Sequence, residues 1–330
     1  MVTAKDVAKR AGVSQATVSY VMSGSRPISE ATKKRVRKAM DELGYVPNAS
    51  ARSLAGGRVG VIGVMVSMDE NTQLAELRPF LVTIMHEARE RGYNVMLIPA
   101  EEGVEGLRHM VRQGMLDGAL VFDIEWHDPR LPEIKKLGVP VVLVGTPEDS
   151  LGLPCADVDY RRIAQLAVNR LAECGAQHVV VFGDMARSAN QYAFSKFFAD
   201  ESRVVAQVLD MDYRLFVPPA NGWRGIWEAA DMVRELARTH GGIAVRTPQT
   251  LDYVLQLCAE LGVKPGEDLS LVAVYPDGHA DTLRTPVTNV DPVPQEASRV
   301  AMASLFAQLD GDDAVKSTLV QPHITVRDER

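Results

Sequence analysis

The stretch TAKDVAKRAGVSQATVSYVMSG, residues 3–24, contains two short helical patterns separated by a glycine. Thr3 is a favourable N-cap, and the small apolar residues after it recur at three-to-four spacing until Gly12, which suits a left-handed C-terminal position. Ser14 can cap a second pattern only two residues later, with Val18 on its inner face. Two helices joined by a tight glycine turn form a helix-turn-helix, and this motif decides the fold of the N-terminal segment.

A third helix is predicted directly after the motif. Ser29 can cap it, Val36 and Leu43 lie on its inner side, and Gly44 ends it. Its outer side carries Lys33, Lys34, Arg37 and Lys38. A basic helix face of this kind is suited to phosphate groups.

Charge is distributed unevenly along the chain of 330 residues. Residues 1–58 contain eleven Lys or Arg and four acids, whereas the whole chain has a net charge of -7. The N-terminal segment is therefore basic and the remainder strongly acidic. A small basic module on an acidic protein suits binding to a polyanion, because each neutralised phosphate releases condensed counterions. Chance clustering of solvated charges is the alternative that composition alone leaves open.

The second helix of a helix-turn-helix enters the major groove with its early residues at the base edges. We predict base contacts for the exposed positions Gln15, Ala16 and Tyr20, since glutamine can bond adenine bidentately and alanine can pack on a thymine methyl. Short hydroxyl side chains suit phosphate oxygens, which fix register rather than sequence. The predicted hydroxyl contacts are Thr3, Ser14, Thr17, Ser19 and Ser29. Helix capping is the alternative role of these hydroxyls, and we expect it to account for part of their function.

Residues 47–57 could form two turns of helix between a proline and a glycine pair. Such a helix is well below the ~12–15 residues that give marginal stability alone, so DNA or a second copy of the chain would have to order it. Leu54 is an apolar residue on a polar segment, as expected of a wedge that enters a minor groove. An ordinary linker whose leucine packs on the body is the alternative.

Residues 3–24 and the following run ISEATKKRVRKAMDELGYVPNASARSLAGG, residues 28–57, resemble the head and hinge of the LacI/GalR family of bacterial transcription regulators. The resemblance covers nearly all of residues 2–66 and, more loosely, the rest of the chain. It implies a homodimer that reads a palindromic operator, with a hinge helix that folds on the DNA and a leucine that opens the central base step. It assigns base-reading and hinge roles to Gln15, Ala16, Asn48, Ala51 and Leu54, and we add Arg52 to the predicted DNA contacts. Tyr20 stands where the family usually has Arg, so we expect a different preferred half-site.

From residue 59 onward, short β-branched runs alternate with helical patterns, which predicts parallel sheets covered by helices on both faces. The predicted fold class is α/β, with a three-helix head and hinge helix followed by two doubly wound lobes, and the family resemblance implies a periplasmic-binding-protein-like body. Ligand is expected in the cleft at the carboxyl ends of the strands. Strands are predicted at 59–66, 94–98, 118–122, 139–145, 178–183, 203–209, 242–245, 269–275, 285–290 and 323–327. Helices are predicted near 74–91, 104–115, 130–137, 160–174, 188–199, 223–239 and 248–261.

These elements predict a division of the chain into three parts. The head spans residues 1–46, the hinge helix and linker 47–58, and the effector-binding and dimerisation body 59–330. Within the body, the first lobe is expected at about 59–158 and 290–315. The second lobe is expected at about 159–289 and 316–330.

Several classes of protein are disfavoured. The sequence has no phosphate-binding loop, nucleophile elbow or metal-ligand spacing, so we expect neither an enzyme nor a cofactor or metal. Three scattered cysteines fit neither a disulfide framework nor a zinc site and are expected to be free thiols. The longest apolar run falls far short of the roughly 18 residues of a spanning helix, and no secretory signal is present. We therefore expect a cytoplasmic protein, associated with the nucleoid when bound to operator, with no membrane partner.

The predicted effector pocket departs from the family pattern. Sugar- and nucleobase-binding members carry an arginine before a Gly-aromatic pair, an Asn-Asp pair and a strand-end Asp, where this chain has residues 191–194 QYAF, 246–247 RT and 275–277 YPD. These departures argue against an ordinary pentose or hexose, or against any tight effector. Arg246 could restore the cation missing near residue 191. The predicted pocket residues are Met68, Gln191, Trp223, Arg246, Asp277 and Asn289, with structural roles as the alternative for each.

The sequence as a whole predicts a DNA-binding transcription regulator, most often a repressor. It would bind double-stranded operator DNA as a homodimer under control of a small-molecule effector, a sugar or related metabolite. Two alternatives stay open. The body could be a dimerisation scaffold without a conventional sugar effector, or an enzymatic body could be fused to a DNA-reading head.

Overall fold

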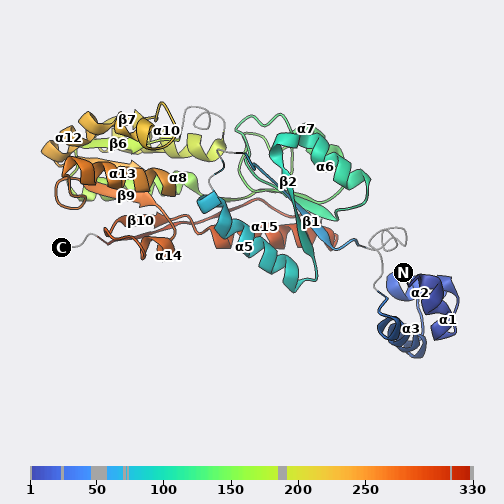
Figure 1. The fold of residues 1–330 in the computed structure, drawn as a ribbon. Coiled ribbons are helices and arrows are strands. Elements are labelled where there is room, and N and C mark those ends of the chain that lie inside the picture. Colours follow the sequence, from blue (N-terminus) through green and yellow to red (C-terminus); the bar gives the residue numbers. More distant parts are fainter. Residues whose placement is uncertain are drawn as a thin grey trace.

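The computed structural model describes residues 2–23, 26–45, 58–69, 72, 74–184, 192–312 and 314–327. The chain forms a three-helix head and a body of two lobes (Figure 1). Among the described residues, no helix has the length and apolar character needed to cross a membrane.

The head consists of α1 (Ala4–Ala11), α2 (Gln15–Ser23) and α3 (Glu30–Leu43). α1 begins at a capping box between Thr3 and Asp6, and it ends at Gly12, whose φ of 65° is left-handed. Val7, Val18 and Val36 are fully buried, one from each helix, and they form the centre of a small core. The predicted helix-turn-helix and third helix are confirmed.

The first lobe is built on a parallel sheet with the strand order β2-β1-β3-β4. Its strands are β1 (Val61–Val66), β2 (Asn94–Pro99), β3 (Gly118–Val121) and β4 (Val141–Leu143). The covering helices are α5 (Leu74–Glu90), α6 (Gly103–Arg112), α7 (Leu131–Ile134) and α15 (Pro294–Leu309), with 3-10 turns η1 (Ala100–Glu102) and η2 (Lys135–Leu137). Side chains of its strands alternate between two separate apolar clusters, one on each face of the sheet. The central strands are therefore apolar on both faces.

The second lobe is built on a six-stranded sheet with the order β12-β10-β9-β8-β6-β7, in which only β12 pairs antiparallel. Its strands are β6 (His178–Phe182), β7 (Asp212–Phe216), β8 (Gly242–Val245), β9 (Ser270–Val274), β10 (Thr288–Asp291) and β12 (His323–Thr325). Its helices are α8 (Tyr160–Glu173), α10 (Ala193–Val208), α11 (Trp223–Trp227), α12 (Ala230–Thr239), α13 (Pro248–Leu261) and α14 (Asp277–Ala280). The α/β fold class is confirmed.

The chain connects the two sheets more than once. After β10, α15 lies beside α5 in the first lobe, and the two helices share extensive contacts (Figure 1). β5 (Ala156–Val158) and β11 (Thr318–Val320) form a parallel pair close to the crossings, and the sequence patterns did not predict this pair. Strands of three residues contain too little periodicity to be recognised in a sequence.

Two predicted elements are wrong. Residues 203–209, expected to form a strand, are in the second half of α10 and the turn after it, and the sheet strand is β7 instead. Phe198, Ser202 and Ala206 are buried at helical spacing, whereas Val208 is 79% exposed, so the apolar run marks one face of a helix. The helix expected at 223–239 is divided into α11 and α12.

Candidate functional site

The exposed surface of the head is centred on the first turn of α2. Ser14 caps this helix: the Thr17 backbone N–H donates to Ser14 Oγ at 3.0 Å, and the two hydroxyls lie 2.8 Å apart. Gln15 and Ala16 follow as exposed residues, while Ser19 is half-buried. Two residues predicted to read bases therefore stand on solvent at the end of the helix that enters the groove in such motifs.

Tyr20 lies on a later turn of α2 and is half-buried. The guanidinium of Arg26 lies 4.9 Å from the centre of its ring, within the range of a cation–π contact. The ring of this α2 residue is thus in contact with a cation of the segment that follows the helix.

Two other predicted hydroxyl contacts are also helix caps. Thr3 accepts from the backbone of Asp6 at the start of α1, and Ser29 accepts from the backbone of Thr32 at 3.4 Å at the start of α3. The predicted hinge contacts Asn48, Ala51, Arg52 and Leu54 lie outside the described residues.

The other helices of the head carry exposed cations. Three basic side chains of the head are paired within it: Arg10 and Lys38 with Glu42, and Lys33 with Glu30. Among the described residues, the remaining exposed cations of α1 and α3 form no salt bridge; they are Lys5, Lys9, Lys34, Arg35 and Arg37. Their charge is available to an anionic partner.

Arg246, predicted to face an effector, is buried in an ion-pair cluster after β8. Its Nε and Nη2 donate to both carboxylate oxygens of Asp184 at 2.6–2.9 Å, and its Nη1 lies 3.4 Å from Oε1 of Glu76. Its guanidinium is also 4.8 Å from the ring centre of Phe194. Burial opposes the charge of Arg246, but Asp184 and Glu76 raise its pKa above the ordinary value. The Arg246 guanidinium, which was expected to face an effector, is thus already paired with carboxylates of the chain.

Two carboxylates of the first lobe lie near this cluster. Burial raises the pKa of Glu76 to about 7, and the attraction of Arg246 only partly opposes this shift. Burial likewise raises the pKa of Asp157 to about 7, although Thr146 and the Val158 backbone donate to its oxygens at 3.1 Å and 2.8 Å. Sequence reasoning missed both residues, and it also missed Asp184, although an acid two residues after β6 is a recognisable strand-end signal.

Asp277, at the start of α14, and Asn289, in β10, lie together. Asn289 is fully buried, and its Nδ2 donates to Asp277 Oδ1 at 2.8 Å. Arg327 Nε donates to Asn289 Oδ1 at 2.8 Å, and His323 Nε2 lies 2.9 Å from Asp277 Oδ2. Burial opposes ionisation of Asp277, but the hydrogen bonds from Asn289 and His323 outweigh it and lower its pKa to about 2.

The same corner contains a group with metal-ligand chemistry. Single ligand atoms of Asp277, Asp291 and His323 all lie within 4.8 Å of one another. However, Arg327 Nη2 already lies 3.3 Å from Asp277 Oδ1. Because this guanidinium supplies the positive charge that a metal would bring, the arrangement suits an internal ion pair better than a metal ion.

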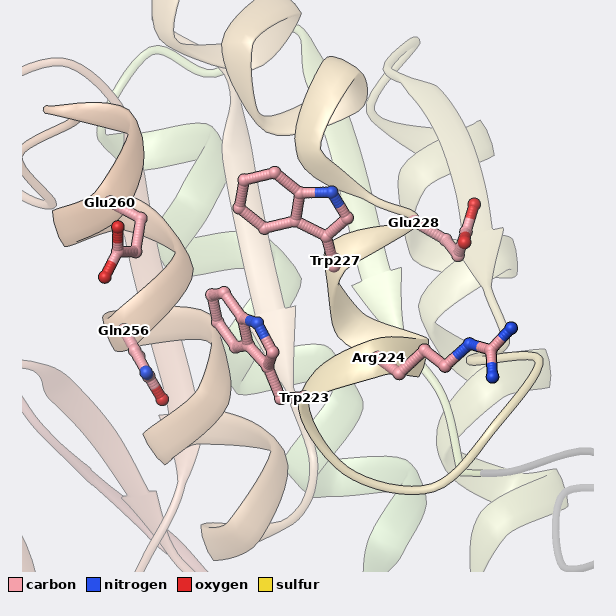
Figure 2. A pocket seen from close by; sticks show the side chains of 6 residues that line it. All are labelled: Trp223, Arg224, Trp227, Glu228, Gln256 and Glu260. Carbon is pink, nitrogen blue, oxygen red and sulfur yellow. The ribbon is translucent and has the colours of Figure 1, made fainter.

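The other predicted pocket residues lie elsewhere. Trp223 lines a cavity of about 590 Å³ with Trp227, Arg224, Glu228, Gln256 and Glu260, and Figure 2 shows its indole between α11 and α13. Gln256 and Glu260 are in the later turns of α13, whereas Arg246 precedes its first turn. Met68 is exposed, with its backbone N–H donating to Glu101 at 3.0 Å, and Gln191 lies outside the described residues. Of the five predicted pocket residues that the structure describes, Asp277 and Asn289 therefore lie together, whereas Trp223 lines a separate cavity.

Comparison with known proteins agrees with this geometry. Residues 3–48 match the bacterial regulatory proteins of the lacI family, and residues 168–328 match the periplasmic binding protein-like domain. The HTH-type transcriptional regulator pepR1 of Lactobacillus delbrueckii subsp. lactis is 26% identical over 99% of this chain and 96% of its own length. Catabolite control protein A of Priestia megaterium is 27% identical over 98% of this chain and 97% of its own.

A solved structure of the lac repressor dimer, bound to operator and the anti-inducer ONPF, has a similar fold. It superposes with a TM-score of 0.80 at 20% identity and covers 99% of this chain and 98% of its own. Three findings point to the same conclusion. They are a helix-turn-helix head with the first turn of α2 exposed, a body of two α/β lobes, and full-length similarity to named regulators. The chain is a DNA-binding transcriptional regulator of the LacI/GalR family.

Proposed function

We propose that the protein is a homodimeric repressor that binds a near-palindromic operator and responds to a small molecule in the cytoplasm. The observation that carries this proposal is the exposed first turn of α2, with Gln15 and Ala16 on solvent and a basic α3 beside it. One short recognition helix reads only a few base pairs, so a second copy related by two-fold symmetry is needed for useful specificity.

We propose specific roles for the DNA-contact residues. Gln15, Ala16 and Tyr20 read bases, and the cap hydroxyls of Thr3, Ser14 and Ser29 stand close enough to the surface to meet phosphates as well. Thr17 and Ser19 add hydroxyl contacts, and Asn48, Ala51, Arg52 and Leu54 act in the hinge when DNA orders it.

The division of the chain into head, hinge and two lobes is also a proposal. We propose a head over 1–46, a hinge over 47–58 and lobes that exchange chain near 158, 290 and 315. The packing of α15 on α5 and the pairing of β12 with β10 support this division. A movement between the lobes could then be transmitted to residue 58, directly before the first strand of the first lobe.

Selection of sequences from random duplex DNA by the full-length protein tests the proposal. We expect enrichment of two half-sites in inverted orientation, and a mass in light scattering that corresponds to two chains. Enrichment of a single half-site, of no sequence, or a monomer at micromolar concentration would contradict it.

A second candidate keeps the DNA-binding head but treats the body as a dimerisation scaffold without a conventional sugar effector. The pairing of Arg246 with Asp184 and Glu76 favours this candidate. The guanidinium donors that would bind a sugar or an anion already bind these carboxylates. Operator affinity that does not change with any metabolite tested would support this candidate. We infer no catalytic function, in agreement with relatives that are named as regulators.

A further inference from the structure

Carboxylates outnumber cations where the two lobes meet. The hydroxyl of Tyr160 interacts electrostatically with three carboxylates, those of Glu76, Asp157 and Asp184, and with one guanidinium, that of Arg246. Glu76 and Asp157 come from α5 and β5, while the other groups belong to the second lobe. Among the described residues, this cluster therefore carries more negative than positive charge when all its groups are ionised.

Asp184 engages two of the three nitrogens of the Arg246 guanidinium. Its carboxylate accepts from Nε and Nη2 of the guanidinium in the bidentate geometry that is strongest for this pair. Its Oδ2 also accepts from the Ser195 hydroxyl. Glu76 has only the longer contact to Nη1, at 3.4 Å, and its side chain is 29% exposed. Glu76 is consequently the surplus carboxylate of the cluster, and it is accessible.

Asp157 is the second carboxylate with unbalanced charge. Its oxygens accept from the hydroxyl and backbone of Thr146 and from the Val158 backbone, and within the described residues it forms no ion pair. The pKa values of Glu76 and Asp157 are both raised to about 7, so near neutral pH a proton supplies part of the missing positive charge.

Aromatic rings stand beside the carboxylates. Phe194 lies 5.6 Å from Tyr160 and 5.3 Å from Tyr192 between ring centres, and the face of Phe194 already holds the guanidinium of Arg246. Ring faces are negative and attract cations, especially where water is excluded. Carboxylates together with aromatic faces are the surroundings that bind ammonium and guanidinium groups.

We propose that the effector is a small organic cation, an ammonium or guanidinium compound, whose charge is neutralised by Glu76 beside the rings of Tyr160, Tyr192 and Phe194. This inference rests on the proposed effector-controlled function and gives the chemical class of the ligand. An anionic effector would have to displace Asp184 or Glu76 from Arg246 and would then lie among carboxylates. A cation instead meets an accessible carboxylate, and because it stabilises the ionised form, it releases protons as it binds.

Two matched series of compounds test the charge of the ligand on the full-length protein. The first is glucosamine, glucose and glucuronate, and the second is 1,4-diaminobutane, 1,4-butanediol and succinate. Thermal unfolding and calorimetric titration at pH 7, in buffers with different ionisation enthalpies, give affinity and proton exchange. We expect at least one cation to bind at least tenfold more tightly than its neutral counterpart, with net proton release. Tighter binding of a neutral or anionic member, no preference for either cation, or net proton uptake would overturn the inference.

Glu76→Gln and Glu87→Gln form a matched pair of variants. Both glutamates are in α5 with similar exposure, but Glu87 pairs with Arg299 inside the first lobe. E76Q should weaken cation binding about tenfold and reduce proton release, and E87Q should change neither. Equal effects of both variants would contradict the role of Glu76.

Operator binding separates this inference from the proposed function. Fluorescence anisotropy with the selected operator is measured on the same samples with and without each compound. If the protein binds operator but prefers an anionic or neutral ligand, only the inference about the charge of the ligand is wrong. If the protein selects no operator, the proposed function is wrong, whichever compound binds.

Discussion

Nη1 of Arg246 lies 3.4 Å from Oε1 of Glu76, and this contact joins the second lobe to the first helix of the first lobe. A second contact crosses at the same helix, where Arg78 Nη2 lies 3.5 Å from His279 Nε2. On the other side, the Ala193 backbone N–H donates to the Ile124 carbonyl at 3.2 Å, and Trp126 packs edge-on against Phe197. Polar and aromatic contacts therefore join the lobes at more than one place.

Replacement of Gln15 by alanine tests base reading. Loss of a bidentate base contact should weaken binding to the selected operator by about 1–3 kcal/mol, while binding to unrelated DNA stays unchanged. Anisotropy titrations with both duplexes measure this. Lys34→Ala is the matched control, since loss of a phosphate contact should weaken both complexes and lower the salt slope by about 1. If Q15A weakens both complexes equally, Gln15 does not read sequence.

Leu54→Ala tests the hinge. A wedge contributes only when the DNA is bent around the protein, so L54A should reduce specific binding far more than nonspecific binding. Electrophoretic mobility of circularly permuted operator fragments should also show a smaller bend. An unchanged bend angle would assign Leu54 to packing instead.

The raised pKa of Glu76 predicts a dependence of stability on pH. A carboxyl whose pKa is 4.5 in the unfolded chain and about 7 in the folded chain holds its proton more tightly when folded. Its contribution to stability is complete below pH 4.5, declines as pH rises and is lost above about pH 7. Glu76→Gln mimics the protonated form, so its free energy of unfolding should decline less than that of the natural protein over this range. Urea denaturation at several pH values measures the difference, and parallel curves would show that Glu76 does not titrate there.

Asp277→Asn should destabilise the second lobe by about 1–3 kcal/mol, because Arg327 and Asn289 then lose a charged hydrogen-bond acceptor. Asp281→Asn is the control, since Asp281 also pairs with Arg327 but is 61% exposed, and its loss should cost at most about 1 kcal/mol. Chemical denaturation of both variants checks this. Similar losses for the two would show that the buried network adds nothing beyond a surface ion pair.

The sequence by itself determined the head, the fold class and the family. Capping residues such as Thr3 and Ser29, glycine stops and helical spacing are local signals, and α1, α2 and α3 follow them closely. The alternating apolar runs of the body likewise indicated parallel sheets, because a strand buried on both faces must be apolar throughout. Local rules failed at residues 203–209, where a β-branched run forms a helix whose position is set by the burial of Phe198 and Ala206.

Only the tertiary structure decided which side chains meet between the lobes. Glu76, Asp157, Asp184 and Arg246 come from four distant segments, and no spacing in the sequence relates them. Arg246 looked available to a ligand because a sequence does not show which carboxylates lie beside a guanidinium, and Trp223 looked like a cleft residue although it faces the later turns of α13. Hydrogen bonds and desolvation depend on distances and burial, which arise only when the strands and helices are packed, so the charge balance around Arg246 follows from the fold and not from the order of residues.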